Sequence, residues 1–588
     1  MVDVARDQRW GRVAETSGED VYLSCEFAAA RVRGFQGEDL TAPDSLLTTP
    51  KHFAAYGAIS AGLDYNFVDM APQTLRDVHL PPFKAALDAG ALTLMSSFND
   101  INGVPASANR ELLTDILRGE WKFEGFVVSD YTSDLELVAH GYAADEADAA
   151  QKALSAGLDM SLQSGVYANH VAALVEQGRL SMAEVDEAVR RVLHVKAAAG
   201  LFDDPYRCLD AAREADQSHI PAHDALARDC ARRSIVLLKN DGDVLPLKKS
   251  GQRIALIGPF AQDTAHLGGC WNIFGDASRM VDLETGLRAA LDDPSALVVV
   301  PGSDIEDAVE GGIEAAVAAA RAADVVLLAL GEPHDFSGEA QSRTQIVIPA
   351  AQQALAEAVA ATGTPVVVVL RNGRALALEG AVRDAQALLV TWFLGTQTGP
   401  AVADVVFGDY NPSARLPVSF PQDAGQQPYF YNHPATGRPN VPGTPRFFQT
   451  RWREVPHAAL YPFGHGLTYT RFEYGLPQLS ATRLGWDDTL TVRTRITNAG
   501  ARDGEEVVQL YVRDRIASRV RPVRELKRFR KIALAAGQSL DVEFTLTRAD
   551  LAFHGVDNRL AAEPGLFDLW IAPSATTGEA VQFELLAP

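Results

Sequence analysis

The sequence predicts a multidomain α/β protein in which a (β/α) barrel is followed by a second α/β sandwich and then by a small β-sandwich. Three observations predict this order. Apolar runs alternate with helical patterns as far as about residue 425. Beyond about residue 472 the pattern changes to alternating strands separated by turn residues. The chain of 588 residues is also long enough for three to four domains.

The first block, residues 1–205, is predicted to be a (β/α)8-type barrel of the TIM class. Its apolar runs are nearly free of polar residues, which is typical of strands buried in a parallel sheet. Five or six such runs can be counted, whereas a closed barrel has eight strands. The clearest are Met1–Ala5, Ser45–Phe53, Ala91–Phe98, Gly125–Asp130 and Gly157–Leu162.

Residues 206–228 are predicted to be a linker, and residues 229–425 a second α/β sandwich with a mostly parallel sheet. Its expected strands are Ser234–Leu238, Arg253–Gly258, Leu297–Val300, Asp324–Leu330, Pro365–Leu370 and Ala387–Trp392. No glycine-rich phosphate-binding motif follows any of these strands, so nothing in the sequence supports a nucleotide site.

Residues 426–471 are rich in Pro, Gly and Asn and are predicted to form a connecting loop. Residues 472–588 are predicted to form an immunoglobulin-like or fibronectin type III-like sandwich. Its expected strands are Leu490–Thr497, Val507–Arg513, Ser539–Leu546 and Leu566–Ile571.

The composition excludes several classes of partner. A net charge of −23 disfavours nucleic acid and anionic membrane surfaces, because both attract basic proteins. No apolar run is long enough to span a bilayer. The four cysteines are too few and too scattered for a disulfide framework or a zinc site, and no other metal-binding pattern is present. We therefore expect no metal site.

Polar side chains stand at the ends of several predicted barrel strands, where barrel enzymes carry their catalytic groups. Asp130 follows a buried run, and Lys51 and His52 end another. Arg12 lies in an Arg-Trp-Gly-Arg segment and offers a planar donor fork to sugar oxygens or a carboxylate. The alternatives are plain: helix capping for Asp130, a solvated Lys51 beside a hydrogen-bonded core histidine, and a surface arginine.

A second source of carboxylates is the loop after Leu330, which contains Glu332, Asp335 and Glu339. Most acidic loops are simply solvated. Two carboxylates on opposite sides of a pocket are, however, what hydrolysis of a glycosidic bond requires. One attacks or stabilises the anomeric carbon and the other protonates the leaving oxygen.

The chain resembles glycoside hydrolase family 3, and in particular its bacterial periplasmic β-glucosidase type. The matching segments are spread along the whole chain in the family's order. They are Val2–Arg12, Pro50–Phe53, Asp64–Asn66, Val68–Met70, Gly125–Tyr131, Ser342–Thr344, Phe407–Pro412 and Tyr461–Tyr469. Each is moderately specific alone, but a chance match of all of them in this order is implausible.

The resemblance implies a role for each candidate. Asp130 matches the family's nucleophile, and Glu339 matches the acid/base residue of periplasmic-type members, with Glu332 as its rival. The other matches are Arg12, Lys51 and His52 as sugar-binding residues, Phe98 at an aromatic position that is often Tyr, and Tyr131 and Trp271 as aromatic subsite walls. The implied enzyme is a retaining, exo-acting β-glucosidase that needs no cofactor, acts on small β-glycosides or oligosaccharides, and depends on docking of the two domains that carry its carboxylates.

Several alternatives stay open. β-Xylosidase or exo-β-glucanase activity fits the same family, whereas the β-N-acetylglucosaminidase branch is disfavoured because Pro-Gly-His-Gly does not follow Lys51-His52. Family members normally carry further residues before the point where this chain begins, so we expect the N-terminal part of the barrel to be missing. An inactive fragment or a sugar-binding protein is the competing class.

A periplasmic or secreted location is implied by resemblance alone, although the chain as given has no signal peptide. A homodimer is left open.

Overall fold

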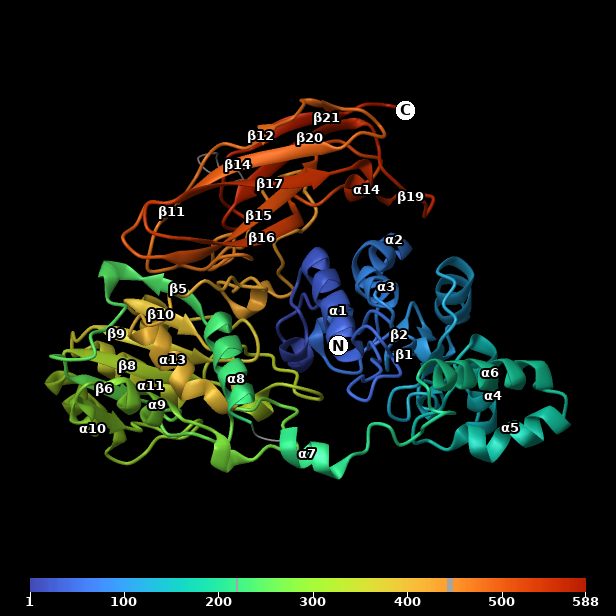
Figure 1. Cartoon of the computed structure of the whole chain (residues 1–588), viewed down its shortest axis with the longest axis horizontal. Helices are drawn as coiled ribbons and strands as arrows, with labels where there is room; N and C mark the ends of the chain where they lie inside the picture. The colour runs from blue at the N-terminus through green and yellow to red at the C-terminus, as the bar shows by residue number, and fades with distance from the viewer. Residues whose placement is uncertain (218–219, 441–447) are drawn as a thin grey trace. The chain divides into compact units, whose positions relative to one another are not determined.

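The computed structural model describes residues 1–217, 220–440 and 448–588 (Figure 1). Part of the expected linker, residues 218–219, and part of the expected connecting loop, residues 441–447, lie outside the described residues. The chain divides into two compact units. Unit 1 comprises Met1–Trp10, Glu15–Ser218 and Val556–Arg559, and unit 2 comprises Gly11–Ala14, His219–Gly555 and Leu560–Pro588.

Unit 1 is organised around parallel extended segments that follow one another in chain order. β1 (Thr93–Met95) pairs in parallel with β4 (Phe126–Val128). Single parallel bridges join Phe53 to Ser96 and Val128 to Met160, and the Val2 amide donates to the Lys51 carbonyl at 2.8 Å. The five apolar runs expected from the sequence therefore lie side by side, which confirms the barrel-type α/β fold of this block.

Helices separate these segments along the chain, as a βα repeat requires. The Asp20 side chain caps the first long helix by accepting a hydrogen bond from the Leu23 amide at 2.7 Å. The helices of unit 1 are α1 (Val21–Gln36), α2 (Pro72–Thr74), α3 (Pro81–Asp88), η6 (Glu111–Glu120), α4 (Glu146–Ala156), α5 (Val166–Glu176), α6 (Met182–Ala198) and α7 (Ala211–Gln217). A short hairpin pairs β2 (Asp100–Ile101) with β3 (Val104–Pro105).

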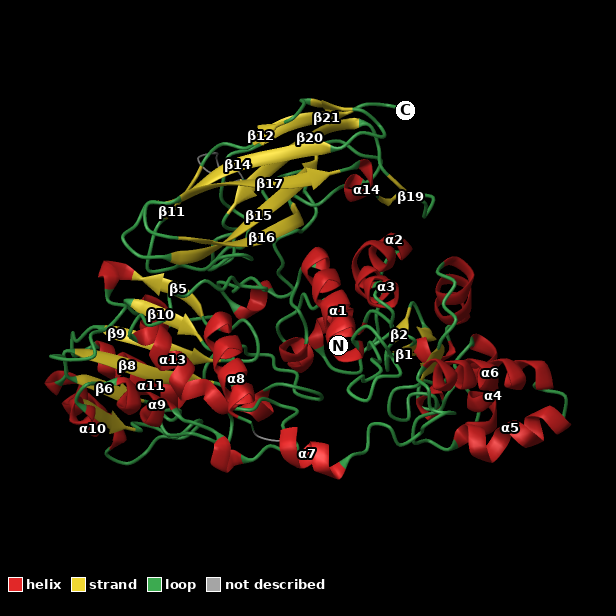
Figure 2. Ribbon diagram, viewed as in Figure 1, coloured by secondary structure: helices red, strands yellow, loops and turns green. Residues whose placement is uncertain are grey.

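Unit 2 contains a six-stranded sheet with the order β5-β10-β9-β8-β6-β7 (Figure 2). All neighbours pair in parallel except the edge strand β5, which runs antiparallel to β10. The strands are β5 (Val236–Asn240), β6 (Ile254–Ile257), β7 (Leu297–Val300), β8 (Val325–Gly331), β9 (Val366–Arg371) and β10 (Ala387–Val390). The expected mostly parallel sheet is thus confirmed.

The central strands of this sheet are apolar throughout because both faces of the sheet are buried. Along β8, Val326, Leu328 and Leu330 belong to one apolar core. Val325, Leu327 and Ala329, which alternate with them, belong to the other. Helices α10 (Gly312–Ala322) and α11 (Ala350–Ala360) contribute to the first core, and α8 (Pro221–Ser234), α9 (Leu283–Ala290) and α13 (Thr398–Val406) to the second. The remaining helix of this part is α12 (Gly380–Asp384).

The C-terminal part of unit 2 is a β-sandwich, as expected. One sheet is built around β14 (Leu490–Asn498) and β17 (Ser539–Leu546), and the other has the order β13-β21-β20-β15-β16. The second sheet comprises β13 (Arg483–Leu484), β15 (Gly504–Asp514), β16 (Glu525–Leu534), β20 (Gly565–Ala572) and β21 (Val581–Leu585). The shorter elements are β11 (Phe472–Tyr474), β12 (Gln478–Leu479), β18 (Phe553–His554), β19 (Leu560–Ala561) and α14 (Arg548–Leu551).

Strand β16 is the longest strand of the sandwich that the sequence pattern did not predict. Its central stretch, Lys527–Lys531, contains four basic residues, so it lacks a clean alternation of polar and apolar side chains. It lies at the edge of its sheet and pairs only with β15. Basic side chains on an edge strand discourage pairing with another chain, which explains this composition.

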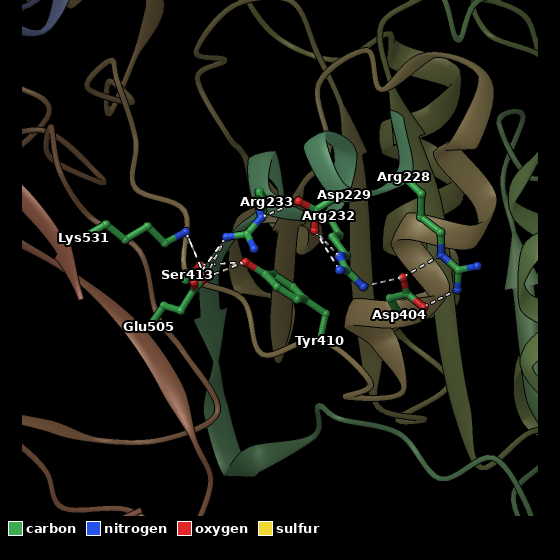
Figure 3. Close-up of polar contacts among 9 residues, drawn as sticks. All are labelled: Arg228, Asp229, Arg232, Arg233, Asp404, Tyr410, Ser413, Glu505 and Lys531. Atoms are coloured by element: carbon green, nitrogen blue, oxygen red, sulfur yellow. Dashed lines mark hydrogen bonds and ion pairs between the residues drawn. The ribbon is translucent and has the colours of Figure 1, made fainter. Parts of the chain in front are cut away.

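A polar cluster joins the β-sandwich to helix α8 and to the segment after α13 (Figure 3). Glu505 of β15 accepts hydrogen bonds from Tyr410 at 2.9 Å and Ser413 at 3.1 Å, and pairs with Lys531 at 3.1 Å. Arg233 of α8 reaches the same carboxylate at 3.2 Å. Burial alone would raise the pKa of Glu505, but Lys531 and the two hydroxyl donors outweigh it and lower the pKa to about 2.

Among the described residues, every helix is too short or too polar to cross a membrane.

Candidate active site

Asp130 stands at the tip of β4, held by the parallel segment beside it. The Ser129 amide donates to the Met160 carbonyl at 2.9 Å, and the Ser129 hydroxyl accepts from the Leu162 amide at 2.8 Å. The Asp130 side chain is 9% exposed, and its Oδ1 accepts a hydrogen bond from the Tyr131 amide at 2.7 Å. A carboxylate is thus presented at the carboxyl end of a buried strand, as the sequence predicted.

His52 faces Asp130 from the adjacent segment. Its Nε2 lies 3.3 Å from Oδ2 of Asp130, and its ring is fully buried. On the other side of the ring, Nδ1 lies 3.1 Å from Oδ2 of Asp3, which also accepts the His52 amide at 2.9 Å. Burial alone would raise the pKa of Asp3, but the hydrogen bonds and positive charge of His52 outweigh it and lower the pKa below 3.8.

Aromatic rings surround this pair of groups in unit 1. Phe98 is nearly buried, and its ring centroid lies 6.5 Å from that of His52, 5.7 Å from that of Tyr56 and 5.2 Å from that of Tyr65. Tyr131, next to Asp130, is 57% exposed and so can contact a ligand with its ring. Lys51 is half-buried directly before His52.

The loop after β8 holds its two glutamates in very different surroundings. Glu332 is completely buried, where it forms an ion pair with Arg343 and lies 3.6 Å from Nε of Arg374. Arg374 in turn donates to the Phe336 and Gln341 carbonyls of the same loop. Glu332 therefore contacts two arginines, and Arg374 connects it to the backbone of the loop.

Glu339 lies further along the loop with 27% of its side chain exposed. Nη1 of Arg12 is 3.6 Å from its Oε2, and the guanidinium of Arg12 also lies 5.8 Å from the ring centroid of Trp271. The Gly338 amide donates to the Gly11 carbonyl at 2.8 Å. A Cβ atom on Gly11 would come within 2.3 Å of the Gly338 carbonyl oxygen, so only glycine permits this close approach.

A pair of histidines connects the start of this loop with the segment that leads to Trp271. Nδ1 of His266 lies 2.8 Å from Nδ1 of His334, and the ring centroids are 4.6 Å apart. Because one nitrogen must donate and the other accept, the two facing atoms share a single proton. Burial is the main cause that lowers the pKa of His266 below 6.5.

The structure thus groups the expected site residues into two sets. Asp130, His52, Lys51, Phe98 and Tyr131 lie in unit 1. Glu339, Arg12 and Trp271 lie in unit 2, because Gly11–Ala14 packs with that unit although both flanking stretches belong to unit 1.

Sequence reasoning missed Asp3 as the partner of His52, and Arg374 as a partner of Glu332. The one available signal for Asp3 was a single acidic residue inside the apolar run Met1–Ala5. In the part of the chain that the structure describes, no group of three or more His, Cys, Asp or Glu side chains is arranged to hold a metal ion.

Three family models match the chain in succession. Residues 1–195 match the glycosyl hydrolase family 3 N-terminal domain, and residues 235–469 match the family 3 C-terminal domain. Residues 506–575 match a fibronectin type III-like domain.

Individual relatives are similar over nearly the whole chain. The periplasmic β-glucosidase of Salmonella typhimurium is 42% identical, with all of this chain and 80% of that protein covered. A β-xylosidase of Formosa agariphila is 36% identical over 97% of this chain and 80% of its own length. The crystal structure of a Listeria innocua β-glucosidase in complex with isofagomine superposes with a TM-score of 0.96 at 39% identity, covering 100% of this chain and 81% of that one.

The family models, the relatives and the solved structures all indicate the same family. The chain belongs to glycoside hydrolase family 3, with that family's N-terminal and C-terminal domains followed by a fibronectin type III-like domain.

Proposed function

We propose that this chain is a retaining, exo-acting β-glucosidase that releases terminal β-D-glucosyl residues from the non-reducing ends of small β-glycosides or oligosaccharides. The observation that carries the proposal is the contact between Asp130 and His52 at the tip of β4. It is supported by the likeness to β-glucosidases of Salmonella typhimurium and Listeria innocua.

In the proposed first step, a carboxylate oxygen of Asp130 attacks the anomeric carbon and forms a glycosyl-enzyme. Glu339 simultaneously gives a proton to the departing oxygen. In the second step Glu339 takes a proton from water, which attacks the anomeric carbon, breaks the ester to Asp130 and leaves the sugar with net retention. The nucleophile is held ready by the Tyr131 amide and by His52.

Glu339 is preferred to Glu332 as the acid/base residue because of what surrounds each carboxylate. A proton donor must reach both the leaving oxygen and water. The side chain of Glu339 is 27% exposed, whereas that of Glu332 is fully buried between Arg343 and Arg374. Glu332 is therefore assigned a structural role.

The remaining residues are proposed to hold the sugar. The cationic Arg12 and Lys51 suit the hydroxyl oxygens of a neutral sugar, and the rings of His52 and Phe98, with centroids 6.5 Å apart, are proposed to line the sugar site. Tyr131 and Trp271, both at least half exposed, offer flat apolar faces for the C–H side of a sugar ring. A periplasmic or secreted location is proposed on the likeness to the Salmonella protein.

The proposal is tested with Asp130→Ala and Glu339→Ala. Asp130→Ala should abolish turnover of an aryl β-glucoside, and near-normal turnover would refute the assignment. Azide should restore turnover to Glu339→Ala on a substrate with a good leaving group, because the small anion replaces the missing carboxylate. Rescue of Glu332→Ala instead would identify Glu332 as the acid.

β-Xylosidase activity is the second candidate, favoured by the 36% identity to the Formosa agariphila β-xylosidase. A panel of aryl β-D-glucosides and β-D-xylosides separates the two. A higher kcat/KM for the glucoside than for the xyloside supports the first proposal, and a lower one supports the second.

A further inference from the structure

Asp3 is an acidic residue in an otherwise apolar segment. Its neighbours Val2 and Val4 are buried, and Asp3 itself is only 2% exposed. A carboxylate in such a place is costly unless it is paired. Its pairing here is with one residue, His52, through both the backbone amide and Nδ1.

The contact with Asp3 determines how His52 is protonated. A carboxylate can only accept hydrogen bonds, so Nδ1 of His52 must carry a proton. With Nδ1 held in this way, the opposite nitrogen, Nε2, lies 3.3 Å from Oδ2 of Asp130. The edge of the Tyr56 ring, with its centroid 5.0 Å from that of His52, and the ring of Phe98 pack against the imidazole and restrict its rotation.

The charged groups that face the imidazole in these contacts are the two carboxylates. Such a setting favours the doubly protonated ring, because each nitrogen then carries its proton next to an anion. Beyond Asp3 lies His79, whose pKa burial and the nearby Arg6 lower to about 3, so it is neutral. Lys51 adjoins His52 along the chain.

We infer that Asp3 is a positioning residue for the nucleophile: it holds His52 with both nitrogens protonated and with Nε2 in ion-pair contact with Asp130. The inference rests on the proposed function, in which Asp130 attacks the anomeric carbon. His52 keeps both protons throughout. It orients the Asp130 carboxylate for attack before the C–O bond forms, and it stabilises that carboxylate when the bond breaks and the carboxylate departs from the sugar.

The test uses 2-deoxy-2-fluoro-β-D-glucosyl fluoride, which traps the glycosyl-enzyme of retaining glucosidases. Fluoride leaves without protonation, so the inactivation rate reports on the surroundings of Asp130 and not on Glu339. Mass spectrometry of the inactivated wild-type enzyme should locate the label on Asp130. Its absence there would overturn the proposed nucleophile, and this inference with it.

The informative variant is Asp3→Asn. Its inactivation should be about tenfold to a hundredfold slower, the range in which partners that orient a functional histidine act. The alkaline limb of the inactivation rate should also move to lower pH, because the imidazolium has lost one of its two flanking anions. Asp3→Glu keeps the charge, so the alkaline limb of its inactivation rate should stay at the wild-type pH.

Asp20→Asn is the matched control. It also removes a buried carboxylate from unit 1, but asparagine still caps α1, so rate and pH profile should stay as in the wild type. The inference is overturned, and the proposed nucleophile stands, if two results are found together. The wild-type enzyme is labelled on Asp130, and Asp3→Asn is inactivated at the wild-type rate with the wild-type pH profile.

A second measurement does not depend on the Asp3 variant folding. Nitrogen-15 NMR of the wild-type imidazoles, with His52→Gln to identify the signal, should find both nitrogens of His52 protonated at neutral pH. A neutral ring, whichever nitrogen carries its single proton, would overturn the inference.

Discussion

Replacing Glu332 by glutamine removes one charge from the interior of the loop that carries Glu339. Glu332 is fully buried against Arg343 and Arg374, and the Arg374 side chain is itself only 1% exposed. Breaking a buried ion pair costs about 3–5 kcal/mol, because a desolvated charge is left without its partner. Arg343 is 22% exposed and can turn toward water, and Arg374 keeps two carbonyl acceptors. The lower end, about 3 kcal/mol, is therefore expected.

A loss of about 3 kcal/mol corresponds to a decrease of about 4 °C in Tm for a folding unit of the size of unit 2, about 370 residues. Differential scanning calorimetry measures it directly, and urea unfolding followed by fluorescence gives the free energy. Glu339→Gln is the matched control in the same loop. Its side chain is partly exposed and lies 3.6 Å from Arg12, so its loss of stability should be well under half that of Glu332→Gln.

The two variants should also differ in activity. Glu339→Gln should lose most turnover of an aryl β-glucoside with a poor leaving group at temperatures far below its Tm. Glu332→Gln should retain measurable turnover while it is folded. The reasoning would be refuted if Glu332→Gln melted with the wild type and lost activity in the manner expected of a missing acid.

Three further outcomes are expected. Gly11→Ala should reduce kcat/KM strongly at unchanged nucleophile labelling, because the new Cβ atom would push the Gly338 carbonyl and the loop behind it; equal kcat/KM would contradict this. Glu505 stabilises the fold above its ordinary pKa of 4.5, and this contribution is lost as the pH falls toward about 2, so the difference in unfolding free energy between wild type and Glu505→Gln should shrink over that interval. Because the pKa of His266 is lowered from 6.5, its contribution is complete above that pH and is lost in acid; His266→Gln should flatten the pH dependence of urea unfolding below 6.5, and an unchanged slope would contradict this role of His266.

The parts of the fold with strong local patterns were predictable. Strands β8 and β9 are apolar along their length because alternate residues enter two different cores, and such runs are readily found. Asp130 could be located for the same reason, since it directly follows a buried run. Strand β16 escaped prediction because, as an edge strand, it can carry basic residues on positions that a central strand would fill with apolar ones.

The candidate site was harder to predict because its pairings join residues distant in the chain. Nothing local distinguishes Glu332 from Glu339, since the burial of Glu332 depends on Arg374, which comes from beyond β9. Likewise, Asp3 meets His52 only because their segments are neighbours in the parallel arrangement. Separation in sequence removes the spacing on which motif reasoning relies.

Dividing the gene between the two units would not divide the protein cleanly. The stretch Gly11–Ala14 is synthesised near the start, but the Gly338 amide with which it pairs leaves the ribosome only after more than half of the chain. A recombinant fragment that begins at residue 220 would lack the Gly11–Ala14 strip, and with it the carbonyl that accepts the Gly338 amide and the guanidinium beside Glu339. Supplying a short peptide that spans Gly11–Ala14 in trans would then be a direct way to ask how much of the loop's order the missing strip provides.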